Sequence, residues 1–370
     1  MKTIVTGLMA LVVAGVSCSR AADPAVPARE KNRAEVDRVY KQNQAKYKDN
    51  PDLLALPGLL ADRKEKRVSI QAEANYPNQP PEFFLIAENS GHDYEAIAIS
   101  FAKPSDIHKG LVFVGLEPGR PCDPARIEFW PKGERVVMTF SGDPASPKAR
   151  SIRAERCCVD DRTGKTLPEK GLVFVGSAML DAPEAPGTRI YAADSRGPNA
   201  IAASYNEPQT VLDVPYQAPQ GVVYGHLTVA PDFDFPANGL IQVILEPEYK
   251  DGRKRVIDLL LSVDGEPATV SLNDLRFSLK SGASELNKEP SLTSVLAAVS
   301  GLVDDGRDPY VSLQFGAGVS LQALHDLCAL LSSVDTEKGM RIEPPRPGQL
   351  FYKAFAPAST FLDRESRMAQ

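Results

Sequence analysis

The sequence predicts an α+β fold with two domains, each a mainly antiparallel sheet with one or two packed helices. The chain has 370 residues, a length that suits two domains better than one. Short segments that alternate between apolar and polar residues, bounded by Gly, Pro and Asn, indicate strands. The 31 prolines exclude a bundle of long helices, because proline breaks the interior of a helix.

Composition and charge exclude several classes of protein. Apolar residues make up 43% of the chain, which is typical of a globular protein and excludes disorder as its main state. With 42 basic and 48 acidic residues, the formal net charge is −6. A dedicated nucleic-acid binder needs a basic face to displace counterions, so we expect no nucleic acid partner.

Residues 1–21 have the pattern of an export signal peptide. Lys2 precedes a run without charged residues at 4–16, and small residues follow it. That run is too short to span a bilayer, which takes about 20 helical residues. We therefore expect an exported protein of the periplasm or cell envelope.

The end of this segment is compatible with two processing routes. Residues 15–18 (GVSC) partly resemble a bacterial lipobox, with Gly15 where Leu is usual. On that route Cys18 is lipidated and becomes the mature N-terminus, and the lipid is the only membrane contact expected. The alternative is peptidase cleavage after residue 21 or 22.

The region from 22 to 215 divides into a polar start and a strand-rich part. Residues 22–65 are predicted to form a polar tether or a solvated helix, with helix formers at 28–47 but few apolar residues. After Pro104, Ser105 and Asp106 indicate the start of a helix that Gly115 ends. The strands expected from residue 66 onward cover 68–72, 82–88, 94–101, 125–130, 135–140, 151–159, 171–179 and 189–205.

One heptapeptide occurs twice. Residues 109–115 and 170–176 both read KGLVFVG, and Val and Phe favour strands in both. Only the first copy follows a helix-start signal, and context overrides propensity. We therefore predict a helix for the first copy and a strand for the second.

Residues 215–221 (PYQAPQG) are predicted to link the first domain, at 66–215, to a C-terminal domain at 222–357. Strands separated by Asp-Gly turns are expected to form a three-stranded meander there. Ser291 is the expected cap of one amphipathic helix, and a second begins at Ser320. The expected strands cover 239–249, 255–263, 267–272, 310–315 and 340–343, and 358–370 is a frayed tail.

The first domain resembles a known family. AKPSDIHKGLVFVGLEPGRP (102–121), KGLVFVGSAM (170–179), YAADSRGPNAIAASYN (191–206) and VLDVP (211–215) are similar to the YdjY-type domain of exported bacterial proteins, including multidomain planctomycete-like proteins. The resemblance implies export and a domain at about 66–215. That family has no established activity, so no catalytic residue is transferred. The part around 310–343 is loosely similar in topology to the periplasmic domain of ExbD-type transport proteins.

Three side chains are the candidates for chemistry. Asp106 and His108 lie on the first turn of the predicted helix, and Glu95 lies on the strand before it. Side chains of these types can bind a metal ion or transfer protons. However, residues two apart on a helix diverge. The alternative has Asp106 at the positive helix terminus and His108 bonded to a backbone group. His92 and Glu95, on a strand, are expected to point to opposite faces.

Four cysteines remain beyond the signal segment, and their spacing forms no Cys/His zinc motif. We interpret them as buried structural thiols, because free cysteine is among the most buried residue types. Strand order is expected to keep Cys122 too far from Cys157 and Cys158 for a disulfide. The fourth, Cys328, lies on the apolar stripe of the last helix.

No nucleophile, phosphate-binding or dinucleotide-binding motif is present, so we assign no catalytic, cofactor-binding or metal residues and expect no cofactor. The sequence favours an exported, non-catalytic cell-envelope protein that is a macromolecule-binding or structural module. Its partner is expected to be an envelope protein or polymer. The alternative is a periplasmic hydrolase-like enzyme or a metal-binding protein that uses Glu95, Asp106 and His108.

Overall fold

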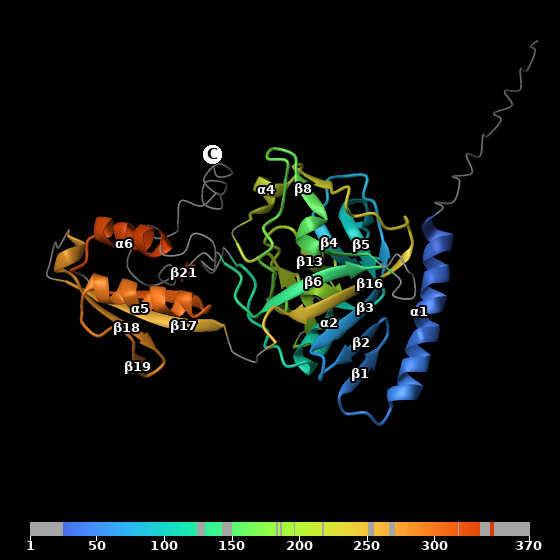
Figure 1. Ribbon diagram of the computed structural model, residues 1–370, viewed down its shortest axis with the longest axis horizontal. Coiled ribbons are helices and arrows are strands. Elements are labelled where there is room, and N and C mark those ends of the chain that lie inside the picture. Colours follow the sequence, from blue (N-terminus) through green and yellow to red (C-terminus); the bar gives the residue numbers. More distant parts are fainter. Residues whose placement is uncertain are drawn as a thin grey trace, which may run out of the picture.

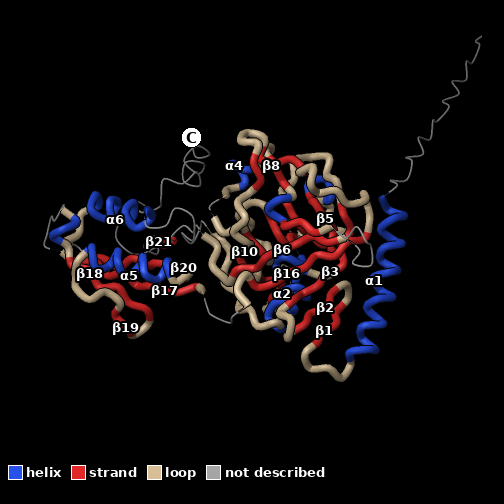
Figure 2. Tube along the Cα trace, viewed as in Figure 1, coloured by secondary structure: helices blue, strands red, loops and turns tan. Residues whose placement is uncertain are grey.

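The computed structural model is a sheet-rich α+β protein with few helices (Figures 1 and 2). In the described part of the chain, no helix combines the length and the apolar character needed to cross a membrane. The structure describes residues 25–333 and 341–343, apart from 124–129, 143–149, 183, 186, 196, 217, 251–254, 266–270 and 317.

Eight strands form a closed barrel. Each strand of the circuit is hydrogen-bonded to the next, and the last, β5, pairs with the first, β3. Neighbours are antiparallel except for β4–β5 and β13–β14, which are parallel. In circuit order the strands are β3 (Arg67–Ala74), β16 (Leu240–Pro247), β6 (Arg135–Ser141), β10 (Leu172–Phe174), β14 (Leu212–Asp213), β13 (Ala200–Ala203), β4 (Phe83–Ala87) and β5 (Ala96–Ser100).

The barrel closes because β3 changes its partner along its length. Its first residues pair with β2 (Leu59–Asp62), whereas Ala72, Glu73 and Ala74 pair with β5. Buried side chains such as Phe84 and Phe174 belong to its core cluster. An eight-stranded barrel is just wide enough for side chains to fill it, so the interior is a core.

Further helices and strands lie around the barrel (Figure 1). β7 lies beside β6, since Thr139 pairs with Arg153 and Ser141 with Ser151. The other elements are the helices α1 (Ala25–Tyr47), α2 (Pro104–Phe113), α3 (Ala192–Ser195) and α4 (Gln220–Val223), and the strands β1 (Leu53–Leu56), β7 (Ser151–Arg153), β8 (Cys158–Asp160), β9 (Lys165–Thr166), β11 (Met179–Asp181), β12 (Arg189–Tyr191) and β15 (Leu227–Val229).

A second sheet follows the barrel in sequence. Its strand order is β19-β18-β17-β20-β21, and its own hydrophobic cluster lies under two helices. Ser291 caps the first helix as predicted, because its side chain accepts a hydrogen bond from the Ser294 amide. The elements are β17 (Val256–Asp264), β18 (Arg276–Ser281), β19 (Ser284–Glu285), α5 (Leu292–Asp304), β20 (Asp308–Phe315), α6 (Leu321–Ser333) and β21 (Arg341–Glu343).

Buried polar contacts join the two sheets. Arg135 of β6 pairs with Asp308 of β20, with Nε 3.2 Å from the carboxylate, and also donates to the Lys170 carbonyl. The Tyr310 hydroxyl donates to the Pro131 carbonyl oxygen at 2.5 Å. Both partners of the ion pair are largely buried, so removing either would leave a costly unpaired charge.

Two predicted boundaries are wrong. Residues 22–65 were predicted to form only a tether or a solvated helix, but they also contain β1 and β2, which extend the barrel sheet beside β3. The predicted linker at 215–221 does not separate two units, because β15 pairs with β8, and β16 lies between β3 and β6. An alternating pattern shows which face of a strand is buried but not which strand it pairs with, so 222–357 looked self-contained.

The predicted C-terminal meander is also wrong, because its first strand is β16, which pairs with β3 and β6 and not with β17. β17 pairs antiparallel with β18, but β17–β20 and β20–β21 are parallel, so this sheet is mixed rather than mainly antiparallel. The expected strand at 125–130 and most of the one at 267–272 lie outside the described residues, as do the tail at 358–370 and the segment 1–24.

The repeated heptapeptide adopts two structures, as predicted. Its first copy ends α2 and its second contains β10. Gly115 ends the helix with a φ of +98°, which favours glycine. The N-terminus differs from the expectation, because Lys103 is the N-cap and the Ser105 amide donates to Asp194 from α3.

We predict that the barrel cannot form without β16. A fragment of residues 22–249 should unfold cooperatively, whereas a fragment of residues 22–221 should not, because β3 and β6 would each lose the partner that joins them. Far-ultraviolet circular dichroism during thermal unfolding measures the difference. Cooperative unfolding of the 22–221 fragment would contradict the closed circuit.

A candidate binding groove at the barrel rim

The three candidate residues do not form one site. Asp106, in the first turn of α2, pairs with Lys109 at 2.8 Å. His108 Nδ1 lies 3.2 Å from the Gly176 carbonyl oxygen and 3.1 Å from the Tyr191 hydroxyl. Burial lowers the pKa of His108, which favours the neutral ring. The interpretation of His108 as a residue bonded to a backbone group is therefore confirmed.

Glu95 has a different partner. It lies in the short 3-10 helix η1 (Asp93–Glu95), with its carboxylate 2.6 Å from His92 Nδ1. The prediction that these two side chains diverge is wrong, because the turn before β5 is not extended. Within the described residues, no three His, Cys, Asp or Glu side chains could together hold a metal ion.

A buried carboxyl lies near this pair. Glu82 is only 4% exposed, and its Oε2 accepts a hydrogen bond from the Gln220 amide at 2.8 Å. Burial raises the pKa of Glu82 against the effect of that hydrogen bond, and the charges of Glu95 and Glu207 act in the same direction as burial. Glu82 therefore lies among acidic side chains, with Glu95 and Glu207 close enough for their charges to raise its pKa.

The cysteines fit the structural interpretation where they are described. Cys122, Cys157 and Cys158 are all buried, and burial raises the pKa of the Cys158 thiol to about 12. A thiol with so high a pKa is a poor nucleophile at neutral pH. The side chain of Cys328, like Cys18, lies outside the described residues.

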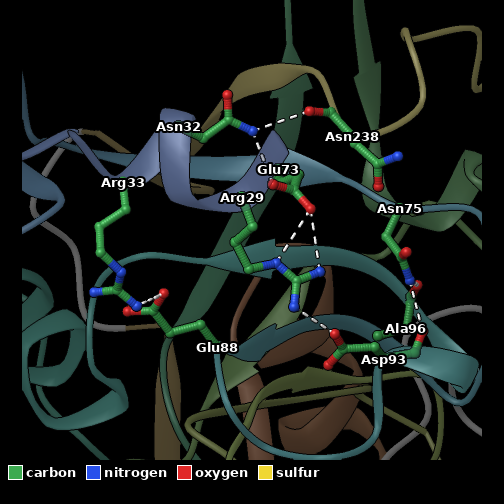
Figure 3. Close-up of polar contacts among 9 residues, drawn as sticks. All are labelled: Arg29, Asn32, Arg33, Glu73, Asn75, Glu88, Asp93, Ala96 and Asn238. Atoms are coloured by element: carbon green, nitrogen blue, oxygen red, sulfur yellow. Dashed lines mark hydrogen bonds and ion pairs between the residues drawn. The ribbon is translucent and has the colours of Figure 1, made fainter. Parts of the chain in front are cut away.

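Glu73 of β3 is a carboxylate that accepts three hydrogen bonds from side chains of α1. Its neighbours along the strand, Ala72 and Ala74, face the core, so Glu73 points outward. It is nevertheless 0% exposed, and Figure 3 shows that α1 covers it. Arg29 binds one carboxylate oxygen through Nε at 3.2 Å and Nη2 at 3.1 Å, and Asn32 donates to the other at 2.8 Å.

The same helix contacts three further segments. Arg29 Nη1 lies 2.6 Å from the Asp93 carboxylate, so one guanidinium joins β3 to η1. Asn32 also donates to the Asn238 carbonyl oxygen, just before β16. Arg33 pairs with Glu88, directly after β4 (Figure 3). One face of α1 therefore contacts the end of β3, η1, a residue just before β16 and the residue after β4, and we call this end of the barrel its rim.

An open groove of about 770 Å³ lies beside this junction, and we call it the rim groove. Its walls come from the segment after β3, the connection between β4 and β5, the residues before β16, and α1. The residues that line it are Arg29, Asn75, Tyr76, Pro77, Asn78, Asn89, Gly91, Asp93, Tyr94, Ala237 and Asn238.

Two tyrosines are the large apolar surfaces of the groove. Tyr76 is 41% exposed and Tyr94 is 44% exposed. The Tyr76 hydroxyl is bonded to the backbone of Phe233 and Phe235, which fixes the position of its ring. The Tyr94 ring lies 5.6 Å from the His92 ring, with its hydroxyl 3.3 Å from Nδ1.

Sequence reasoning missed this groove. In the segment 67–74 (RVSIQAEA), Glu73 occupies a polar position of an alternating strand and is indistinguishable from a solvated residue. A signal was present in the helix, where Arg29, Asn32, Arg33 and Val36 recur at helical spacing. Val36 is 3% exposed and Arg29 and Asn32 are partly buried, so this stripe is the face that packs on the barrel, with Arg33 at its exposed edge.

No protein-family model, curated protein or solved structure matches the chain.

We predict that Arg29→Ala lowers the free energy of unfolding by about 3 kcal/mol, because it leaves the buried Glu73 without its charged partner. Arg38→Ala on the same helix is the matched control. It breaks an exposed pair with Glu35, and should leave the free energy of unfolding almost unchanged, because solvent screens such pairs. Chemical denaturation measures both, and equal effects would contradict the role of Arg29.

Proposed function

We propose that the protein is an exported, non-catalytic cell-envelope protein that binds a macromolecule through the rim groove. The observation that carries this proposal is the groove, an open volume of about 770 Å³ with amide, charged and tyrosine side chains on its walls. Its size is typical of ligand sites, which are generally concave with a few convergent polar groups. Its open form suits one segment of a long ligand.

The arrangement of the chain supports a binding module. Apolar side chains fill the interior of the barrel. Polar side chains line the groove at its rim. The groove is built on strand ends held by the pairing of Arg29 with the buried Glu73, and rigid walls lower the entropy cost of binding. We also propose that the barrel and the C-terminal sheet are two domains, since each has its own hydrophobic cluster.

The enzymatic and metal-binding alternative has less support. It required Glu95, Asp106 and His108 to act together, whereas each has a different partner. The export signal, lipidation of Cys18 and the YdjY-type resemblance stay predictions. They are consistent with an envelope partner.

The proposal predicts that the purified mature protein sediments with insoluble envelope fragments of the cells that produce it. Tyr76→Ala and Asn78→Ala should each weaken this binding about five-fold, a factor typical of losing one aromatic or hydrogen-bonded contact. Met179→Ala is the control, because Met179 is 47% exposed and is not among the groove residues.

Centrifugation at increasing protein concentration, with the bound fraction measured by immunoblot, gives the three affinities. Circular dichroism of each variant verifies that it is folded. Unchanged binding of both groove variants, or an equal loss with Met179→Ala, would contradict a role of the groove.

A further inference from the structure

We infer that the rim groove recognises a glycan, namely a chain of pyranose sugars with equatorial substituents and little net charge. This inference rests on the proposed function and adds the class of ligand. Such sugars have an apolar face of C–H groups and a rim of hydroxyls that both donate and accept hydrogen bonds. The groove contains partners for both.

Two tyrosine rings of the groove could stack against the apolar face of a sugar. The Tyr76 hydroxyl is bonded to backbone groups of the 233–235 segment, so the exposed part of this side chain is ring surface held in a fixed position. The Tyr94 ring is held against His92. Tyrosine offers a large rigid surface at low cost in conformational entropy, which suits stacking against a sugar ring.

Asparagine side chains of the groove are possible partners for the hydroxyl groups of a sugar. Asn75, Asn78, Asn89 and Asn238 line the groove, and each side-chain amide has both a donor and an acceptor group. Asn75 uses its NH2 group to bind the Asp93 and Ala96 carbonyls, so its fixed amide presents the oxygen as an acceptor. Asn78 and Asn89 are exposed. This mixture matches hydroxyl groups, which need both donors and acceptors.

The charges disfavour other polymers. Arg29 is the cation of the groove lining, and it is already bound by Glu73 and Asp93. A nucleic acid or another polyanion needs unpaired cations that displace counterions. The fully buried centre of a protein interface is mostly apolar, whereas four asparagine side chains make the lining of this groove polar. An uncharged polyhydroxyl chain fits this lining best.

Isothermal titration of the full mature chain with chitohexaose and with cellohexaose tests the inference. The first probe represents N-acetylated wall glycan and the second an unsubstituted glucan, so the two arms distinguish these sources. We expect saturable binding of at least one. Tyr94→Leu should weaken that binding about ten-fold, whereas Tyr94→Phe, which keeps the ring, should remain within two-fold of wild type. Met179→Ala should not change it.

The outcomes separate this inference from the proposed function. If neither oligosaccharide binds, while Tyr76→Ala still weakens binding to envelope fragments and protease treatment of those fragments abolishes it, the ligand is a protein and the glycan inference is overturned. If oligosaccharides bind equally to wild type and Tyr94→Leu, the groove is not their site. If the groove variants alter neither kind of binding, the proposed function fails as well.

Discussion

Closure of the barrel between β3 and β5 is the constraint on which the other features depend. At the end of β3, Ala72 and Ala74 pair with Ser100 and Ala98 of β5, and Glu73 between them pairs with Ile99. Without that pairing the sheet would be open, and the ends of β3 and β5 would not meet. Closure brings the segment after β3, the turn before β5 and the residues before β16 to one rim, where they form the groove.

The parallel pairing of β4 with β5 adds a second constraint. Parallel neighbours need a connection that returns along the sheet, usually a dozen or more residues long. Here residues 88–95 make that return, and Asp93 within them pairs with Arg29 of α1. The guanidinium of Arg29 then bridges Asp93 and Glu73 (Figure 3). A buried carboxylate without a partner is costly, so Glu73 fixes where α1 lies.

The sequence predicted local secondary structure better than it predicted which strands and side chains contact one another. Patterns of two and 3.6 residues identified most strands and both C-terminal helices, and the context of Pro104 and Gly115 separated the two KGLVFVG copies. The pairing of β16 with β3, about 170 residues earlier in the chain, has no local signature. The same holds for Glu73, whose burial depends on α1. His92 and Glu95 were misplaced because a 3-10 turn, not a strand, carries them.

Hydrogen–deuterium exchange of the mature protein, with and without saturating chitohexaose or cellohexaose, tests the central claim most directly. The claim is that barrel closure unites three separate segments into one binding site. It predicts that peptides covering 75–78, 89–94 and 237–238 become protected together, at the same ligand concentration, while the C-terminal sheet does not change. Protection confined to one of these segments, or located in the C-terminal sheet, would contradict it.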